Sequence, residues 1–386
     1  MDFSLPEELL LLQQTVRKFV QEELIPIEMQ SLDGTDLKPE IRARLEEKTK
    51  KMGLWMLDVP QEHGGAGLDF LAQVIVWEEM SKTVVLPSRG QGILGPEVRP
   101  ILFQCTEKQK EKYLYPVLRN EKRMCFAQTE PDAGSDPGSM KTRAVRQGDV
   151  YVLDGVKRFI SNADKCQFAQ VLAVTDPAKG AHGGISCFLV DLDTPGCRIT
   201  AKYKTMMGEE PCEIVFEDCK VPAENLVGKE GEGFKLGQRW LGIGRIKHGA
   251  RALGVADRCI EMAAKYAKQR VTFGKPLAER QAIQWMLADS YMELHAARLM
   301  TYHAAWKYDQ GEDIRNEAYM VKLYADEMAY RVVDKAIQIH GAIGLTCDLP
   351  LERWFRDQRS RLITEGASEI MRMMIARHVF RQYAPG

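Results

Sequence analysis

A change in hydrophobic periodicity along the chain constrains its fold more than any other feature. From Phe234 onward, apolar residues recur at every third or fourth position over long stretches, which is the spacing of amphipathic helices. Three such stretches begin near residues 246, 283 and 320, and a fourth occupies most of residues 359–378. Four consecutive helices of this kind predict a four-helix bundle.

The segment from about Met124 to Gly233 has a different pattern. Its apolar stretches are short, rich in β-branched and aromatic residues, and separated by residues that favour turns, such as Asp154-Gly155. Before residue 122, helical patterns alternate with breaks that contain Gly and Pro. Four stretches of the middle segment are therefore expected to be strands of an antiparallel β domain: residues 151–161, 169–176, 184–193 and 212–222.

These three patterns predict an α+β fold rather than a repeated βαβ winding. A chain of 386 residues is also longer than a single hydrophobic core usually supports. The expected domains are an N-terminal α-helical domain (1–122), a middle β domain (123–233) and a C-terminal four-helix bundle (234–386). The GxGxxG pattern at Gly90, Gly92 and Gly95 follows no convincing strand, so we expect a loop there rather than a dinucleotide site.

Composition excludes several classes of function. The net charge of −1 lacks the basic excess that nucleic acid or an anionic membrane would require. None of the apolar runs approaches the ~20 residues of a transmembrane helix. The cysteines form no CxxC pair and the histidines no HExxH, so neither a disulfide framework nor a metal site is expected. The first residues carry acids and lack a basic start, which predicts a cytoplasmic, bacterial-type location.

Five short segments carry the candidate chemistry. The first, CFAQTEPDAGSD (125–136), combines turn-forming residues with the hydroxyls of Thr129 and Ser135, which suits a polar ring and a phosphate. Taken by itself, this segment would be better interpreted as a linker. The other four follow in chain order: GVKRFISN (155–162), QRVTFGKPLAERQ (269–281), QIHGAIG (338–344) and ITEGASEI (363–370).

With these five segments in this order, the chain resembles the acyl-CoA dehydrogenase family over essentially its whole length. The resemblance implies an N-terminal helical domain, a middle β domain and a C-terminal four-helix bundle. It implies FAD as the cofactor, usually one per subunit of a homotetramer built as a dimer of dimers. It also implies an acyl-CoA substrate from fatty acid metabolism (β-oxidation) and an electron-transfer flavoprotein as the partner.

The resemblance further implies which residues contact the cofactor. Thr129 would bond the isoalloxazine edge, Ser161 would bond N5, and Ser135 would lie near both the FAD phosphates and the CoA chain. Arginine suits a pyrophosphate because its guanidinium can bind two oxygens at once. The remaining residues expected at FAD are Phe126, Gln128, Phe159, Ile160, Ala367 and Glu369. The residues expected to reach the FAD of a neighbouring subunit are Arg270, Thr272, Gln281, Gln338, Ile339 and Gly341.

Glu365 matches the catalytic carboxylate of the family. The α-hydrogen of a thioester is a very weak acid, so the base must be close, oriented and poorly solvated; burial is expected to raise its pKa. Its own N–H and a flavin hydroxyl would stabilise the enolate oxygen. Some relatives place the base just before an arginine of the first bundle helix, but here Gly244 precedes Arg245, so Glu365 has no rival there.

The residues expected near the substrate are Ser135, Gly242, Gly244, Arg245 and Gly366. Gly366 would let the backbone approach the substrate because it has no Cβ. Gly242 and Gly244 indicate either a pocket widened for a bulky acyl group or close helix packing, and both interpretations remain open. Arg245 is expected to support the pocket or to pair with an acid.

Several positions depart from the family pattern and leave the substrate open. They are Ala367 after Glu365-Gly366, Ala342 in QIHGAIG, Glu209 after MMG and Asp132 in TEPDAGSD. Chain length, branching and any distal carboxylate of the acyl group are not predicted. An acyl-CoA oxidase, an enoyl-CoA reductase working in the reverse direction and a catalytically silent flavoprotein remain alternatives to the dehydrogenase.

Overall fold

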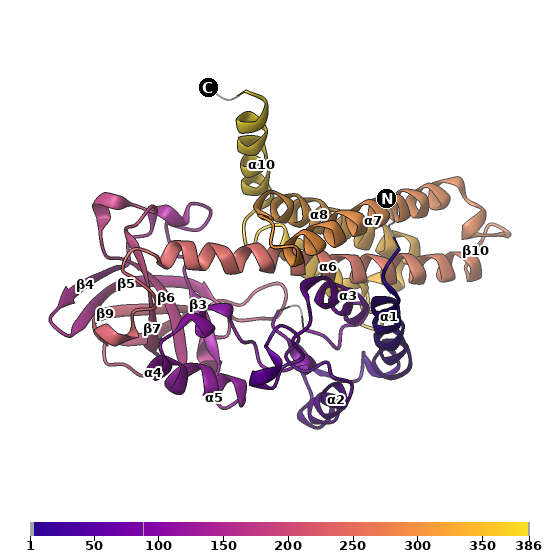
Figure 1. The fold of residues 1–386 in the computed structure, drawn as a ribbon. Coiled ribbons are helices and arrows are strands. Elements are labelled where there is room, and N and C mark those ends of the chain that lie inside the picture. The colour runs from indigo at the N-terminus through magenta and orange to yellow at the C-terminus, as the bar shows by residue number, and fades with distance from the viewer. Residues whose placement is uncertain (1–3, 88, 385–386) are drawn as a thin grey trace. The chain divides into compact units, whose positions relative to one another are not determined.

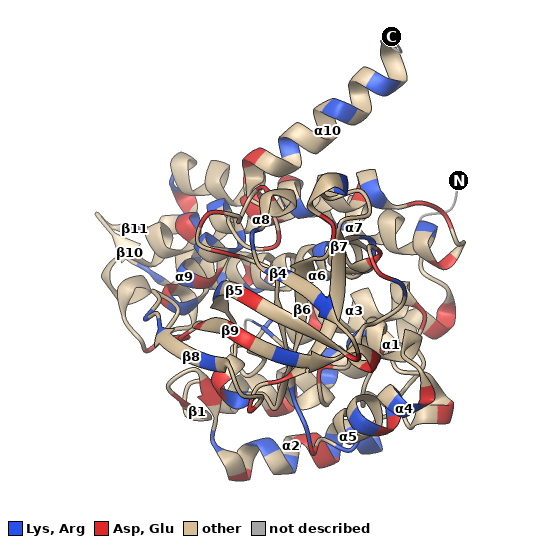
Figure 2. Ribbon diagram, turned by 90° about the vertical axis from the view of Figure 1, so that its left-hand side faces the viewer, with Lys and Arg blue, Asp and Glu red and all other residues tan. Residues whose placement is uncertain are grey.

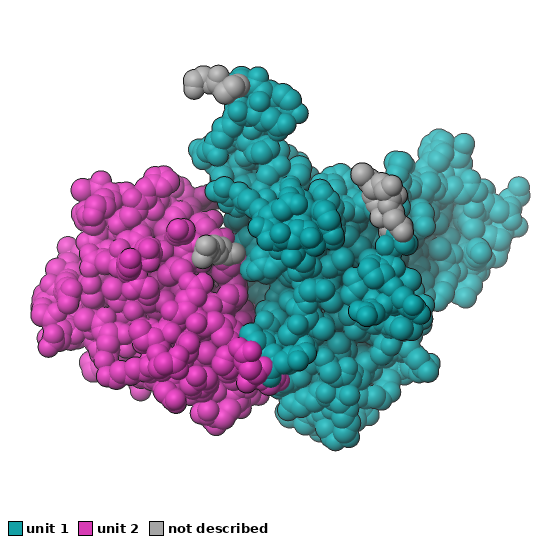
Figure 3. Space-filling view, viewed as in Figure 1, with its two compact units in different colours: residues 1–61, 65–94, 242–386 teal, residues 62–64, 95–241 magenta. Residues whose placement is uncertain are grey.

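The structure is a computed structural model that describes residues 4–87 and 89–384. The chain divides into two compact units, coloured separately in Figure 3. Unit 1 comprises residues 1–61, 65–94 and 242–386, and unit 2 comprises residues 62–64 and 95–241. Each unit is described below by itself.

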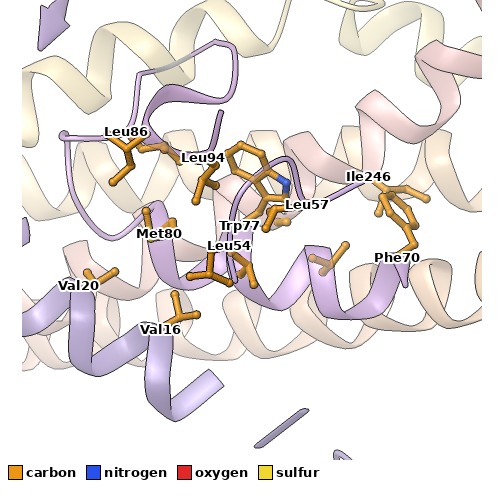
Figure 4. Packing of buried hydrophobic residues seen from close by; sticks show 14 of the residues in the cluster. Val16, Val20, Leu54, Leu57, Phe70, Trp77, Met80, Leu86, Leu94 and Ile246 are labelled. Atoms are coloured by element: carbon orange, nitrogen blue, oxygen red, sulfur yellow. The ribbon is translucent and has the colours of Figure 1, made fainter. Parts of the chain in front are cut away.

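The N-terminal part of unit 1 is mainly helical. It contains α1 (Glu7–Phe19), α2 (Pro39–Lys51), α3 (Phe70–Met80) and a small hairpin of β1 (Leu32–Asp33) and β2 (Asp36–Leu37). Asp69 begins α3, because its carboxylate accepts a hydrogen bond from the N–H of Ala72 at 2.9 Å. Helix α3 is buried on nearly all sides, and its Trp77 packs in one apolar cluster with Val16 and Leu57 (Figure 4).

Long helices form the C-terminal part of unit 1. They are α6 (Gly233–Gln269), which enters unit 1 at Gly242, α7 (Gln281–Asp309), α8 (Arg315–His340) and α10 (Ser368–Tyr383). Helix α8 lies beside α7 and also contacts α10 (Figure 1). A hairpin of β10 (Val271–Thr272) and β11 (Lys275–Pro276) connects α6 to α7. The four expected helices are present, and α9 (Leu351–Arg361) is an additional helix that the periodicity did not predict.

Unit 2 is built on a seven-stranded sheet. The strands are β3 (Met124–Ala127), β4 (Arg143–Gln147), β5 (Val150–Ile160), β6 (Phe168–Val174), β7 (Ile185–Asp191), β8 (Cys197–Lys202) and β9 (Cys212–Pro222). They follow the order β3-β6-β4-β5-β9-β8, and β7 pairs with β6. Two short helices, α4 (Glu107–Gln109) and α5 (Tyr115–Leu118), precede the sheet in the chain. The expected α+β class is confirmed, with its β segment in the middle.

Two expectations about this sheet are wrong. It is not wholly antiparallel, because β3 and β4 each pair with β6 in parallel. A long segment separates β3 from β6, and such a connection permits a parallel pairing. Asp154-Gly155 is not a turn but lies within β5, where the register with β9 shifts between Leu153 and Gly155. Gly155 has φ +152°, and a Cβ there would lie 2.5 Å from Thr142 Oγ1, so the bulge depends on glycine.

The GxGxxG segment forms the predicted loop. It contains only a short 3₁₀ turn, Gly92–Leu94, and among the described residues no strand leads into it. No helix in the described part of the chain is both long and apolar enough to cross a bilayer. Lysines and arginines are interspersed with acidic residues over the helices and strands (Figure 2).

Candidate active site

Glu365 lies in a strained turn of unit 1 between α9 and α10. Its φ is +57°, a left-handed conformation that costs energy for a residue with a side chain, and Gly366 follows at +109°. Arg245, from α6, holds this turn because its Nε donates a hydrogen bond to the carbonyl oxygen of Glu365 at 3.0 Å. Arg245 therefore supports the site through the backbone, and Glu365 precedes rather than begins helix α10.

The two carboxylate oxygens of Glu365 have different surroundings. Oε1 lies 3.3 Å from Nε2 of His248, which also belongs to α6. Oε2 is inaccessible to solvent and has no hydrogen-bond partner among the described residues, although the side chain as a whole is 24% exposed. A Cβ at Gly244 would lie only 2.8 Å from Oε2. Gly244 therefore leaves room for the carboxylate of Glu365.

The charge around Glu365 opposes the effect of its burial. Burial by itself would raise the pKa of Glu365, but the positive charges of His248, Arg89 and Arg245 outweigh it and lower that pKa to about 2. The prediction that burial raises the pKa of Glu365 is therefore wrong. The anionic form of the carboxylate is therefore favoured, and His248 makes the largest of the contributions that lower its pKa.

Behind His248 lies a second, more deeply buried carboxylate. Asp326 Oδ2 is 3.5 Å from His248 Nδ1 and 3.7 Å from Lys322 Nζ, and Asp326 and Lys322 are both fully buried on α8. Lys322 also donates a hydrogen bond to the carbonyl oxygen of Arg361 at 2.7 Å. The sequence interpretation missed His248, Lys322 and Asp326. Helical spacing could have indicated them. Residues 244 and 248 are four positions apart, as are residues 322 and 326, so each pair shares one face of its helix.

In unit 2, the structure brings together two of the predicted flavin segments. The N–H of Arg158 donates a hydrogen bond to the carbonyl oxygen of Thr129 at 2.8 Å, which connects the end of β3 to the end of β5. Phe159 has φ +58° and is 55% exposed, and Gln128 Oε1 is buried without a hydrogen-bond partner among the described residues. An exposed aromatic ring and a buried acceptor without a donor, on two segments that this hydrogen bond connects, fit a planar ring with N–H groups, so these residues fit a flavin.

Other predicted residues of this segment vary in exposure. Thr129 and Ser161 are half-buried and Ser135 is exposed, whereas Ile160 is buried in the core of unit 2. The ring of Phe126 is half-buried and lies 5.2 Å from that of Trp240.

A buried ion pair supports the segment of Gln128 to Glu130. Lys157 Nζ lies 2.7 Å from Glu130 Oε1 and donates a hydrogen bond to the carbonyl oxygen of Gln128 at 3.1 Å. Lys157 is fully buried, and burial lowers its pKa to about 8 despite the opposing effect of Glu130. The pair therefore fixes the backbone beside the candidate flavin contacts.

Lys157→Met is expected to destabilise the protein by about 3–5 kcal/mol, because it leaves the Glu130 carboxylate buried without a cation. Urea denaturation followed by circular dichroism measures this loss. Lys141→Met is the matched control, since Lys141 pairs with Asp132 on the exposed surface and its loss should change stability little. Equal effects of the two substitutions would contradict this role of Lys157.

The residues expected to reach a neighbouring subunit lie at the ends of helices in unit 1. Arg270 and Thr272 are at the β10–β11 hairpin, Gln281 begins α7, and Gly341 ends α8 with φ +64°. Arg270, Gln281 and Gln338 are exposed, whereas Ile339 is buried in the core of unit 1. Ala367 occupies the N-cap position of α10, and Glu369 is exposed in its first turn. Their contacts with FAD stay predictions.

Comparisons with known proteins place this arrangement in one family. Sequence models of that family match in chain order: acyl-CoA dehydrogenase N-terminal domain at residues 6–121, middle domain at 125–219 and C-terminal domain at 231–380. The mitochondrial short-chain specific acyl-CoA dehydrogenase of Mus musculus is 40% identical, with 98% of this chain and 92% of that protein aligned. Acryloyl-CoA reductase (NADH) of Anaerotignum propionicum is 39% identical, with 99% and 97% aligned. The solved structure of butyryl-CoA dehydrogenase from Megasphaera elsdenii matches with a TM-score of 0.84 at 34% identity, over 99% of this chain and 100% of that one.

These findings define a flavin-dependent oxidoreductase. The chain belongs to the acyl-CoA dehydrogenase family, whose members use FAD. The family, the enzyme class and the cofactor predicted from the sequence are therefore confirmed.

Proposed function

We propose that the protein oxidises an acyl-CoA thioester to the trans-2-enoyl-CoA, with Glu365 as the base that removes the α-proton. The electrons then leave to an electron-transfer flavoprotein. The observation that carries this proposal is the environment of Glu365. One of its oxygens, Oε2, is buried and unbonded among the described residues, and Arg245 fixes the turn on which it stands. A carboxylate oxygen without competing donors can accept a proton from a carbon acid.

The roles of the neighbouring residues follow from this chemistry. The N–H of Glu365 is proposed to donate a hydrogen bond to the thioester oxygen, where negative charge develops as the α-proton leaves. Gly366 is proposed to let the substrate approach the backbone, because it has no Cβ. Gly244 keeps space for the carboxylate, since any side chain there would contact Oε2.

Residues of unit 2 are proposed to hold the cofactor. Gln128, Thr129 and Ser161 would supply hydrogen bonds, Phe126 and Phe159 would supply aromatic contacts, and Ile160 completes this set. Ala367 and Glu369, which belong to unit 1, are proposed as further FAD contacts. The chemistry that FAD supplies when bound is acceptance of the β-hydrogen as a hydride at N5. Ser135 is proposed to contact both FAD and CoA. Contacts from a neighbouring subunit in a homotetramer are proposed for Arg270, Thr272, Gln281, Gln338, Ile339 and Gly341.

The acyl group is proposed to be short. Support comes from the similarity to the short-chain specific enzyme of Mus musculus and to the butyryl-CoA dehydrogenase of Megasphaera elsdenii. Similarity to an acryloyl-CoA reductase favours a second candidate, reduction of an enoyl-CoA on the same site. Glu365 would then return a proton to the α-carbon instead of removing it.

Anaerobic titration of the purified holoenzyme with acyl-CoAs tests the proposal. A saturated short acyl-CoA is expected to bleach the visible flavin absorbance, and an enoyl-CoA is expected not to. Linear, branched and cyclic acyl groups of increasing size would then define the substrate. A flavoprotein that no acyl-CoA bleaches, but whose reduced form an enoyl-CoA reoxidises rapidly, would favour the reductase. A protein that neither takes up FAD nor reacts with any acyl-CoA would refute both candidates.

A further inference from the structure

We propose that His248, supported by Asp326, is a positioning residue that keeps the buried Glu365 carboxylate ionised and directs Oε2 to the substrate. Because this role rests on the proposed function of Glu365, its experiment measures the ionisation of Glu365 separately from turnover. The proposal begins from an imidazole that lies between two carboxylates. Nε2 is 3.3 Å from Glu365 Oε1, and Nδ1 is 3.5 Å from Asp326 Oδ2.

Both carboxylates can receive a hydrogen bond from the His248 ring only if the ring is an imidazolium. A neutral imidazole has one N–H and one lone pair, so it can donate to one carboxylate while its lone pair faces the other. An imidazolium can donate to both. Asp326 is fully buried, and neither of its oxygens has a hydrogen-bond partner among the described residues. A buried carboxylate without hydrogen-bond partners is costly; Lys322 Nζ at 3.7 Å reduces that cost, and a nearby imidazolium would reduce it further.

The arginines near Glu365 keep their positive charge near neutral pH. Arg245 on α6, Arg89 on the loop before Gly90, and Arg361 at the end of α9 are permanently cationic. On α8, Lys322 Nζ contacts Asp326 at 3.7 Å, and burial lowers the pKa of Lys322. Histidine is the residue whose charge changes most readily in this range. The proposed ionising role is therefore assigned to His248, whose Nε2 lies 3.3 Å from Glu365 Oε1.

The contact between His248 and Glu365 also gives the two carboxylate oxygens different roles. His248 occupies Oε1, and Oε2 remains buried and unbonded within the described structure beside Gly244. A carboxylate held through one oxygen has less freedom to rotate, so the other oxygen keeps one orientation. A base that is both ionised and oriented before the substrate arrives needs less reorganisation at the moment of proton transfer.

Infrared spectroscopy of the holoenzyme between about pH 5 and pH 8 tests the ionisation. A protonated carboxylic acid has a carbonyl stretch that a carboxylate lacks, and the band of Glu365 is assigned by its loss in Glu365→Gln. Wild type is expected to show no such band in this range. His248→Gln is expected to show it at the acidic end, with a midpoint above the ordinary glutamate pKa of 4.5, because only the smaller effects of Arg89 and Arg245 then oppose burial.

Steady-state kinetics test the orientation. His248→Gln keeps an N–H that can donate to Oε1, whereas His248→Leu fills similar space without a donor. At the pH where activity is greatest, we expect His248→Gln to stay within about threefold of wild type and His248→Leu to lose at least about tenfold in kcat. His295→Gln, an exposed histidine on α7, is the matched control and should change neither kcat nor the infrared spectrum.

Each outcome decides the proposal. A Glu365 band in wild type between pH 5 and 8, or its absence at acidic pH in His248→Gln, would overturn the ionising role. Equal kcat values for the Gln and Leu variants would overturn the orienting role. If the variants do not fold, the wild-type titration still tests the ionised state. If Glu365→Gln remained active, the proposed function would fail, but the infrared result would still decide whether His248 ionises Glu365.

Discussion

Glu365→Gln is expected to bind FAD and acyl-CoA normally and to lose turnover by about 10²–10⁴-fold. Glutamine has nearly the shape of glutamate, so it preserves the left-handed turn and the hydrogen bond from Arg245 to the backbone carbonyl. Its amide cannot accept the α-proton. The rate of anaerobic flavin bleaching by substrate measures the loss, and the visible spectrum confirms that the cofactor is present.

The matched control is Glu312→Gln, which removes a carboxylate that pairs with Lys307 far along the sequence from the candidate site. We expect this variant to bleach at the wild-type rate. Near-normal activity of Glu365→Gln would show that another group removes the proton. Loss of FAD from that variant would show that Glu365 is needed for cofactor binding rather than for chemistry.

Gly254→Ala is expected to destabilise the protein strongly. In the structure, a Cβ at Gly254 of α6 would lie 2.0 Å from the carbonyl oxygen of Glu78 and 2.9 Å from Ser81 Cβ. Because the closer atom is backbone of α3, relief requires one of the two helices to move. Overpacking of this kind costs about 1–3 kcal/mol or more, which exceeds the gain of about 1 kcal/mol from replacing glycine within a helix. The midpoint of thermal unfolding is expected to fall by about 2–4 °C for each kcal/mol lost.

Gly242→Ala supplies the comparison on the same helix. A Cβ at Gly242 would meet no atom within 4 Å, so only the helix propensity changes and stability should rise by about 1 kcal/mol. This open space also disfavours close helix packing as the reason for Gly242. If both variants changed the unfolding temperature by the same amount, the close approach of α3 and α6 would not limit the residue at position 254.

The sequence predicted those features that depend on neighbouring residues or on a recognisable motif. The 3.6-residue period identified the long helices, and the five segments together, through their resemblance to the family, identified Glu365 as the candidate base. His248, Lys322 and Asp326 could not be found in this way, because they belong to no motif and meet Glu365 only through the packing of α6 against α8. The prediction of a raised pKa for Glu365 was wrong for the same reason. The sequence indicated that Glu365 is buried, but it did not show which cations surround the carboxylate.

The same holds for the sheet: the sequence predicted where its strands lie but not how they pair. The four long strands were predicted from their composition, but the parallel pairing of β3 and β4 with β6 depends on contacts between distant segments. Asp154-Gly155 has the composition of a turn, and its place within β5 became clear only from the pairing with β9 and the contact with Thr142. Local patterns thus identified elements, whereas long-range contacts determined their neighbours.

The left-handed backbone at Glu365 has a consequence for how this position can change over generations. Glycine or asparagine would adopt φ +57° more readily than glutamate, so mutation and selection for stability together favour replacing Glu365. A lineage that no longer needed a base would be free to make that change. A chain that keeps glutamate in this backbone conformation retains a residue that stability alone disfavours, which is expected of an active enzyme rather than of a silent relative.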